Sequence, residues 1–441
     1  MKRYFRSFWD YLIYFEWKLQ KHKKLVLILA ALGLVLPVLV NIFAPRNWGA
    51  YKNASFVIPI VMILLGIIKR ALSVYGRQNI SFESSKKVIS LSENVLPSEL
   101  EESRGFVTVK KDNGGTGAFV YSREFNKSFV ANRAWDPGLE CHDRSSRYSA
   151  VIANVRSQAT ENRIAVLGSL FGSLRLGKKT LINESKVGLM TDLKPNTETV
   201  EVYKTDYFSD MCLITNGMKN IVSRSDGQIT VISPAIPKRM PYEAVDKECT
   251  QVRLYDFERT TPAISLHMGV EILAVSKDFL FRIPIQSHHV QYATGERAPF
   301  ASGSMDWEDV LGVSTLKAAV IKAATRELQE EWGGDGNPPQ IKSIQVIGYF
   351  RACHRGGKPQ FVCFAKLDND DSNIFPDTSE NYKGNDDPKT VYNLEQLVAE
   401  LNRQISEEFH NPDSVALQGA LHCLRDFCLD HPENTKKILS A

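Results

Sequence analysis

The chain has 441 residues, with 54 lysines and arginines against 50 aspartates and glutamates, so its formal net charge is +4. Hydrophobic residues make up 43% and charged residues 24%, which is typical of a globular protein and excludes wholesale disorder. The small, dispersed excess of positive charge predicts no nucleic-acid polymer as a partner, and seven scattered cysteines without a CxxC pair predict neither a disulfide framework nor structural zinc.

Two apolar runs near the start of the chain predict a transmembrane hairpin within residues 25–75. Residues 25–44 are twenty positions without a charge. At about 1.5 Å of rise per helical residue they span roughly 30 Å, the thickness of a hydrocarbon core. The second run, 54–68, has fifteen uncharged residues and reaches the same span if its flanking aromatic and basic residues lie at the two interfaces. A buried helical hairpin in a soluble core is the alternative.

The charges that flank these runs predict the orientation of the hairpin. Residues 1–24 carry seven basic side chains, whereas the loop 45–53 carries two. The positive-inside rule therefore predicts a two-pass protein with both termini in the cytoplasm. Eight aromatic residues lie among the basic ones of 1–24, which predicts an amphipathic helix on the cytoplasmic leaflet, with packing against the soluble part as the alternative.

The remainder of the chain divides into two parts. Residues 76–184 are interpreted as a connector and a small strand-rich region, because short apolar runs alternate there with turn signals. Residues 185–434 are predicted to form an α/β domain with a mixed sheet between helices. Its expected helices are 314–332, 393–408 and 412–429, and its expected strands are 199–203, 228–232, 252–256, 264–275, 279–285, 342–350 and 360–367.

Three glutamates near the end of the first expected helix are candidate metal ligands. Glu327, Glu330 and Glu331 are spaced i, i+3 and i+4, so their carboxylates share one face and repel one another. A hard cation that prefers oxygen ligands, Mg²⁺ or Mn²⁺, compensates such repulsion. From the spacing alone, a solvated acidic face is an equal alternative.

The string REL-Q-EE-W-G at 326–333 resembles the Nudix box, GX5EX7REUXEEXGU. The resemblance implies an α/β/α Nudix fold and metal-assisted attack of water on the pyrophosphate of a nucleoside diphosphate joined to another group. It also implies that Glu330 and Glu331 bind magnesium and that Glu327 is a further ligand or the base. Arg326 then orients the carboxylates.

The upstream half of the box departs from the family pattern. Strict spacing back from the helix finds Gly312 in place but Ala318 where the family has glutamate. A second alignment pairs Gly303 with Asp309 and needs a nine-residue insertion before the helix. We prefer the second, because residues 298–303 resemble the turn that normally precedes the box. One carboxylate of the family pattern is missing or displaced in either alignment.

Polar residues beside the strands around the box are weaker candidates for nucleotide binding. Arg351, His354 and Arg355 follow the strand after the box, and His288 and His289 follow the strand before it. Arginine pairs well with phosphate, and histidine can stack or hydrogen-bond. Surface loop residues without a ligand are the alternative for all five.

The whole arrangement resembles the two-transmembrane Nudix effectors of bacterial antiphage systems that signal with cyclic oligonucleotides (CBASS). This resemblance implies a protein of the bacterial inner membrane whose Nudix-like domain binds a nucleotide messenger, with a cyclic oligonucleotide as a candidate. Binding is then expected to drive homo-oligomerisation and disruption of the lipid bilayer. A membrane-tethered, Mg²⁺-dependent Nudix pyrophosphohydrolase is the competing hypothesis, and a scaffold with a relic of the box is the third.

Overall fold

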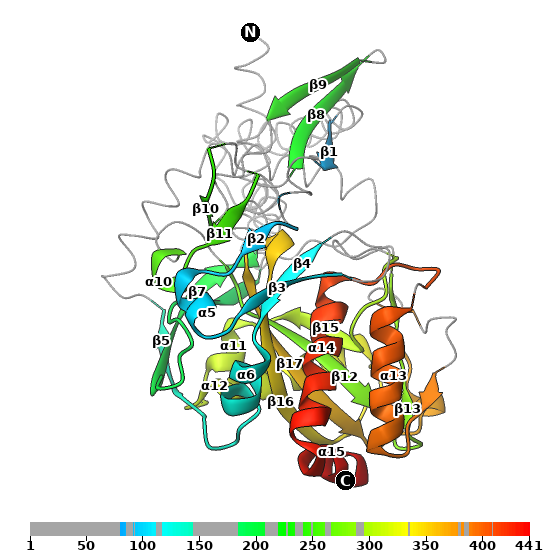
Figure 1. Cartoon of the computed structure of the whole chain (residues 1–441). Helices are drawn as coiled ribbons and strands as arrows, with labels where there is room; N and C mark the ends of the chain where they lie inside the picture. The colour runs from blue at the N-terminus through cyan, green and yellow to red at the C-terminus, as the bar shows by residue number, and fades with distance from the viewer. Residues whose placement is uncertain are drawn as a thin grey trace, which may run out of the picture. The chain divides into compact units, whose positions relative to one another are not determined.

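The structure is a computed structural model that describes residues 80–84, 91, 93–111, 117–143, 184–207, 219–225, 228–233, 241–247, 250–260, 266–287, 295–333, 336–377, 381–382, 388–407 and 409–441 (Figure 1). The chain forms two compact units. The smaller unit contributes a three-stranded sheet in the order β1-β8-β9, formed by Ile80–Ser84, Lys219–Ser225 and Gln228–Ser233. The larger unit contains the remaining described elements.

An eight-stranded sheet lies at the centre of the larger unit. Its order is β19-β13-β12-β17-β16-β4-β3, and β15 also pairs with β12. Strands β12 and β17 run parallel, and the other neighbouring pairs run antiparallel. In chain order the strands are β3 Val107–Lys110, β4 Ala118–Tyr121, β12 Gly269–Val275, β13 Leu280–Phe281, β15 Ala301–Ser304, β16 Ile341–Ala352, β17 Lys358–Leu367 and β19 Lys389–Thr390.

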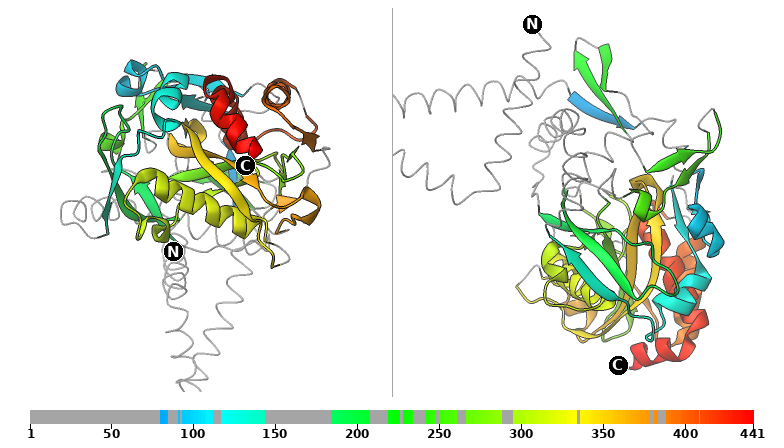
Figure 2. Two further views of the ribbon diagram at one scale, coloured as in Figure 1. Left: turned by 90° about the horizontal axis from the view of Figure 1, so that it is seen from below. Right: turned by 90° about the vertical axis from the view of Figure 1, so that its left-hand side faces the viewer.

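Helices cover both faces of this sheet (Figure 2). Helix α12 (Leu316–Glu331) packs with Val270 and Ile272 of β12 in one hydrophobic cluster. Leu273, which points the opposite way because side chains alternate along a strand, joins a second cluster. That cluster also contains the helices α13 (Leu394–Ser406), α14 (Val415–Asp430) and α15 (Pro432–Ser440).

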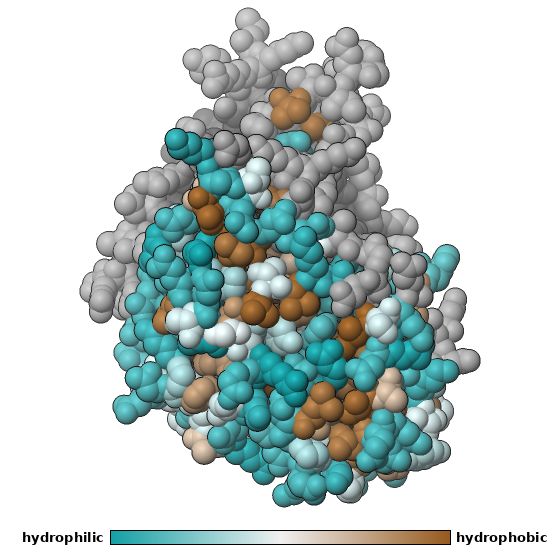
Figure 3. All heavy atoms as spheres, in the orientation of Figure 1, coloured by the Kyte–Doolittle hydropathy of each residue, from teal (hydrophilic) through white to brown (hydrophobic). Residues whose placement is uncertain are grey.

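A pair of glycines allows α14 to lie close to β16. A β-carbon at Gly419 would stand 2.6 Å from the ring of Phe350, and one at Gly348 would stand 2.6 Å from the β-carbon of Cys423. Both distances are below ordinary van der Waals contact. The outer face that carries α13 and α14 is mainly hydrophilic with separate apolar spots (Figure 3). Such single exposed apolar side chains, for example Leu429, are normal for a soluble surface.

Smaller sheets and short helices complete the larger unit. The sheets are β5-β7-β6 (Gly138–His142, Thr199–Asp206, Ser185–Leu189), β10-β11-β2 (Tyr242–Ala244, Val252–Leu254, Val95–Leu96) and β14-β18 (Ile285–Gln286, Asn381–Tyr382). The short helices are α5 Glu99–Ser103, α6 Arg123–Phe125, η1 Asn126–Val130, α10 Phe257–Thr260, α11 Trp307–Val310, η3 Cys353–Arg355 and η4 Asp371–Asn373.

The predicted fold class, a membrane-anchored two-helix transmembrane hairpin followed by an α/β/α Nudix-like sandwich, is wrong. The structure is a mixed α/β fold with a curled sheet, and none of the helices it describes is long and apolar enough to cross a membrane. The sheet curls because β16 shifts register twice against β17, and such irregularities bend a strand and increase its twist. The predicted spans 25–44 and 54–68 and the amphipathic segment 1–24 lie outside the described residues.

The region 76–184, interpreted above as a connector with a small strand-rich part, contributes directly to the main sheet. Strand β4 pairs with β16, so that Phe350 lies opposite Tyr121. Strand β3 pairs with β4 and continues the sheet outward. Strands from before residue 184 and strands from after it therefore belong to one sheet.

Candidate functional site

Helix α12 holds the three glutamates of the motif in different environments. Its N-cap is Thr315, and it runs without glycine or proline to Glu331. Glu327 and Glu331 are buried, with 8% and 6% of their surfaces exposed. The side chain of Glu330 is 60% exposed. The helix therefore directs Glu327 and Glu331 toward the protein interior and Glu330 toward solvent.

Arg326 joins the acids of the motif. Its guanidinium stands 2.9 Å from a carboxylate oxygen of Glu327, of Glu330 and of Asp309. Asp309 lies in α11, the short helix before α12. The alignment that starts at Gly303 therefore places an acid against Arg326, whereas the strict alignment places Ala318 near the start of α12.

Strand β15 lies directly against the carboxylates of α12. The backbone N–H of Ser302 donates a hydrogen bond to Oε1 of Glu331 over 2.9 Å. At Gly303, a β-carbon would overlap the carboxylate of Glu327. A residue without a side chain is needed here for the close approach of strand and helix.

Burial dominates the electrostatics of Glu327. Loss of solvent raises the pKa of Glu327 to about 8, although the adjacent positive charges of Arg326 and Lys186 act in the opposite direction. A carboxyl group with a pKa near neutrality can both hold and release a proton at physiological pH.

Glu271 is a second buried acid close enough for the charge of Glu327 to act on it, although it lies on the face of β12 turned away from α12, and no motif of the sequence includes it. It lies on β12, opposite Ser302 of β15, and is 2% exposed. Burial raises the pKa of Glu271 to about 8, the positive charges of Lys358 and Arg355 oppose this, and Glu327 adds to it. Its Oε2 has no hydrogen-bond partner. The signal in the sequence was a single acid within a strand that is otherwise apolar.

Positive charges gather beside these acids. Lys358 of β17 donates a hydrogen bond from Nζ to Oγ of Ser304 over 3.1 Å. His267 is fully buried, and its pKa lies well below the usual value because of burial and of the charges of Lys358, Arg355 and Lys186. Buried acids next to lysine and arginine suit a ligand that combines anionic groups with a bound cation.

The structure separates the other candidate nucleotide-binding residues. Arg355 lies near enough to Glu271 to lower its pKa. Arg351 instead is fully buried, stands 3.1 Å from Glu101 and lies over the ring of Phe257 at 4.2 Å. Burial lowers the pKa of His354 to about 3, so it is neutral at physiological pH. His288 and His289 lie outside the described residues.

The donor atoms fit the divalent cation that the motif implies. Carboxylate oxygens are the ligands that Mg²⁺ prefers, and Glu327, Glu330 and Glu331 supply them along α12. Within the described part of the chain, no three acidic, histidine or cysteine side chains already enclose a position for a metal ion. Arg326 instead bridges Glu327 and Glu330, so a cation would compete with its guanidinium for these carboxylates.

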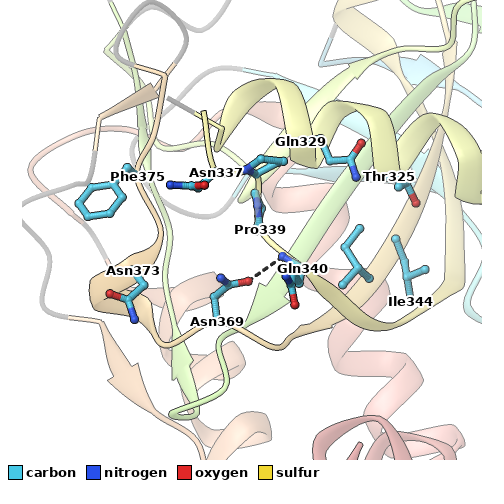
Figure 4. A pocket seen from close by; sticks show the side chains of 11 residues that line it. Thr325, Gln329, Asn337, Pro339, Gln340, Ile344, Asn369, Asn373 and Phe375 are labelled. Atoms are coloured by element: carbon cyan, nitrogen blue, oxygen red, sulfur yellow. Dashed lines mark hydrogen bonds between the residues drawn. The ribbon is translucent and has the colours of Figure 1, made fainter. Parts of the chain in front are cut away.

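The opposite side of α12 lines a cavity of about 930 Å³ (Figure 4). Thr325 and Gln329 line it, and the helical repeat places them away from Glu327 and Glu331. None of the lining side chains is charged, and this cavity is therefore distinct from the acidic site. The other lining residues are Asn337, Pro338, Pro339, Gln340, Ile341, Ile344, Asn369, Asn373 and Phe375.

Comparison with known proteins gives little independent support for any function. No family model and no curated protein matches the sequence. Among solved structures, the chain is similar to DR0079 from Deinococcus radiodurans, with 16% identity, 36% of this chain and 83% of that chain covered, and a TM-score of 0.24. A TM-score at this level carries no argument, and the functional argument therefore rests on the site itself.

Proposed function

We propose that this protein is a Mg²⁺- or Mn²⁺-dependent hydrolase that cleaves the pyrophosphate linkage of a nucleoside diphosphate derivative. The observation that carries the proposal is the contact of Arg326 with Asp309, Glu327 and Glu330 within the segment that resembles the Nudix box. The same residue types at this spacing are those that the resemblance assigns to metal binding and catalysis. Lys358 and Arg355 also support the proposal, because positive side chains can bind the phosphates of such a substrate. Their charges lower the pKa of Glu271.

Each side chain of the site would have a separate role in this reaction. Glu330 and Glu331 would hold the cation, which neutralises phosphate charge and lowers the pKa of water, and Glu327 would be a further ligand or the base. Arg326 keeps Glu327 and Glu330 at a fixed distance from each other. Lys358 and Arg355 bind phosphate oxygens, because lysine and arginine form charge-assisted hydrogen bonds with them. Glu327, with a pKa of about 8, is the group best suited to accept a proton near neutral pH.

A turnover assay with matched variants tests the proposal. The full chain is incubated with ADP-ribose, GDP-mannose or UDP-glucose, with and without Mg²⁺, and nucleoside monophosphate is measured. Glu330→Gln should lower kcat at least about a hundredfold, since it removes one charge at the rim and no buried contact. The control Glu395→Gln, on the exposed first turn of α13, should leave kcat unchanged. Absence of Mg²⁺-dependent product, or equal activity of both variants, contradicts the proposal.

The effector role expected from the CBASS resemblance stays a prediction. It depends on the action of residues 25–44 and 54–68, which lie outside the described residues. Adding a cyclic oligonucleotide to the same assay separates the two roles. Tight binding of the cyclic species without product favours a sensor, whereas turnover of a linear pyrophosphate favours the hydrolase.

A further inference from the structure

The uncharged cavity beside α12 lies between three segments of the chain (Figure 4). Its walls are α12, residues 337–344, which lead into β16, and residues 369–375, which follow β17. Its volume of about 930 Å³ is typical of sites that hold small molecules. Because its lining on α12 faces away from Glu327, the cavity is a candidate binding site separate from the acidic one.

Hydrogen bonds hold the walls of the cavity in place. The N–H of Gln340 donates to Oδ1 of Asn369 over 2.6 Å, which joins two of the walls (Figure 4). The N–H of Asp368 donates to the carbonyl of Gln340 over 2.8 Å. Beside them, Arg282 anchors the short helix η4 by donating from Nε to Asp371 over 2.9 Å. Walls that are fixed before a ligand arrives reduce the entropic cost of binding.

Side-chain amides dominate the polar lining of the cavity. Gln329, Asn337 and Asn373 come from three different walls, and none of their side chains hydrogen-bonds to another described residue. Each amide offers two N–H donors and one accepting oxygen. None of the described lining residues is charged, so an ionic ligand would lose water here without gaining a counter-charge. The lining therefore favours a neutral ligand that both donates and accepts hydrogen bonds.

Apolar surface lies beside these amides. The ring of Phe375 is 43% exposed and stands at one end of the cavity, whereas Ile344 lies at the other end (Figure 4). The face of an aromatic ring carries partial negative charge, so it attracts C–H groups as well as offering apolar area. A ligand with polar edges and apolar faces would complement both kinds of lining.

We propose that this cavity binds an uncharged saccharide, with the C–H face of a pyranose ring against Phe375. A sugar hydroxyl both donates and accepts, which matches the amide side chains of the lining. The hydroxyls project from the ring in several directions, and the amides approach from three walls. A planar nucleobase instead presents its polar groups in a single plane. This binding is additional to the proposed hydrolysis and does not depend on it.

Calorimetry and saturation-transfer NMR of the full chain test the inference with four neutral disaccharides: maltose, cellobiose, lactose and mannobiose. At least one should bind with a Kd of about 1 mM or lower. Glucose 6-phosphate and glucuronate carry a charge and should bind at least about tenfold more weakly than that disaccharide. Absence of binding for all four at concentrations up to about 10 mM overturns the inference. Tighter binding of adenosine than of any disaccharide also overturns it, because the cavity would then suit a nucleobase.

Variants of the cavity locate the binding. Asn373→Ala removes one amide and Phe375→Ala removes the ring, and each should weaken binding of the disaccharide at least about fivefold. Asn402→Ala and Tyr392→Ala replace an amide and an aromatic ring outside the cavity, and these matched controls should bind like wild type. All four side chains are exposed, so the variants should fold like wild type. Unchanged affinity in both cavity variants contradicts the inference.

Glu330→Gln separates the cavity from the acidic site. This variant changes the acidic side of α12 and should bind the disaccharide as tightly as wild type, whatever its effect on hydrolysis. Loss of disaccharide binding in Glu330→Gln, with binding retained in Asn373→Ala and Phe375→Ala, would assign the saccharide to the acidic site and overturn the inference.

Discussion

At the scale of single residues, the site contains acids that oppose folding. Glu327 stands 2.9 Å from Arg326, yet burial still raises its pKa to about 8. The folded protein therefore disfavours the charged form of Glu327 more strongly than the ion pair favours it. Acids that are costly in the folded state but required for chemistry are a common feature of functional sites.

This cost predicts a pH dependence of stability. The usual pKa of glutamate is 4.5 and that of folded Glu327 is about 8, so between these values the folded chain binds more protons than the unfolded chain. The free energy of unfolding should therefore fall as the pH rises through this window. Between pH 5 and 8 without divalent cations, wild type should lose up to about 4 kcal/mol more than Glu327→Gln in urea unfolding. Parallel pH profiles of the two proteins would contradict the prediction.

The sequence revealed part of the site at this scale. Glu327, Glu330 and Glu331 share a helix face because their spacing fixes it, and Arg326 is near them for the same reason. Glu271 was missed: a single acid in an apolar strand marked it, but only the register of β12 with β15 shows which strand it lies beside. Arg351 was expected in a loop. Strand β16 instead extends to Ala352, so Arg351 belongs to the strand and its side chain is buried.

At the scale of elements, the contact of β15 with α12 controls the position of the acids. It consists of the Ser302–Glu331 hydrogen bond and of the close approach at Gly303. A strand edge and a helix held this closely leave little freedom to the carboxylate of Glu327. Small changes in this contact should therefore affect catalysis more than stability.

Two glycine substitutions test this expectation. Gly303→Ala introduces a β-carbon into the carboxylate of Glu327 and should lower kcat/KM at least about tenfold. Gly312→Ala meets no atom within 4 Å but must adopt a φ of +76°, so it should cost about 1 kcal/mol of stability and leave kcat/KM unchanged. Steady-state kinetics and urea unfolding of both variants check this. Equal losses of activity in both variants would show that the close approach of β15 to Glu327 at Gly303 has no particular role in catalysis.

Element boundaries were predictable where they depend on local signals. The expected helices 314–332 and 393–408 correspond to α12 at Leu316–Glu331 and α13 at Leu394–Ser406, because capping residues and helical periodicity are local. The expected strand 264–275 is shortened to β12 at Gly269–Val275, and 279–285 is reduced to the two residues of β13. Strand ends depend on distant partners, which no local pattern specifies.

At the scale of the whole larger unit, a buried ion pair ties the early part of the chain to the sheet. Glu101 of α5 and Arg351 of β16 are 2% and 0% exposed and stand 3.1 Å apart. Asn126 adds hydrogen bonds to both the N–H and the carbonyl of Tyr349. Residues 93–111 and 117–143 are thus joined to the main sheet by buried polar contacts as well as by strand pairing.

Removal of one partner of this ion pair should destabilise the larger unit. Glu101→Gln leaves the charge of Arg351 buried without its counter-ion and should lower the free energy of unfolding by about 3–5 kcal/mol. The double variant Glu101→Gln, Arg351→Met removes the charge as well and should recover part of this loss. Urea unfolding of the three proteins measures it. A loss below about 1 kcal/mol in the single variant would mean that Phe257 and the backbone carbonyls suffice for Arg351.

The pairing of β4 with β16 also has a consequence for synthesis on the ribosome. Asn126 and Tyr349, which bond each other beside this pair, are 223 residues apart in the chain. At about 5–20 residues per second, the ribosome needs roughly 10–45 seconds to reach the second partner after the first has emerged. During that interval the apolar strand β4, all of whose residues are buried in the finished protein, has no strand to pair with on its inner side. The nascent chain should therefore depend on a chaperone that shields this strand until translation is nearly complete.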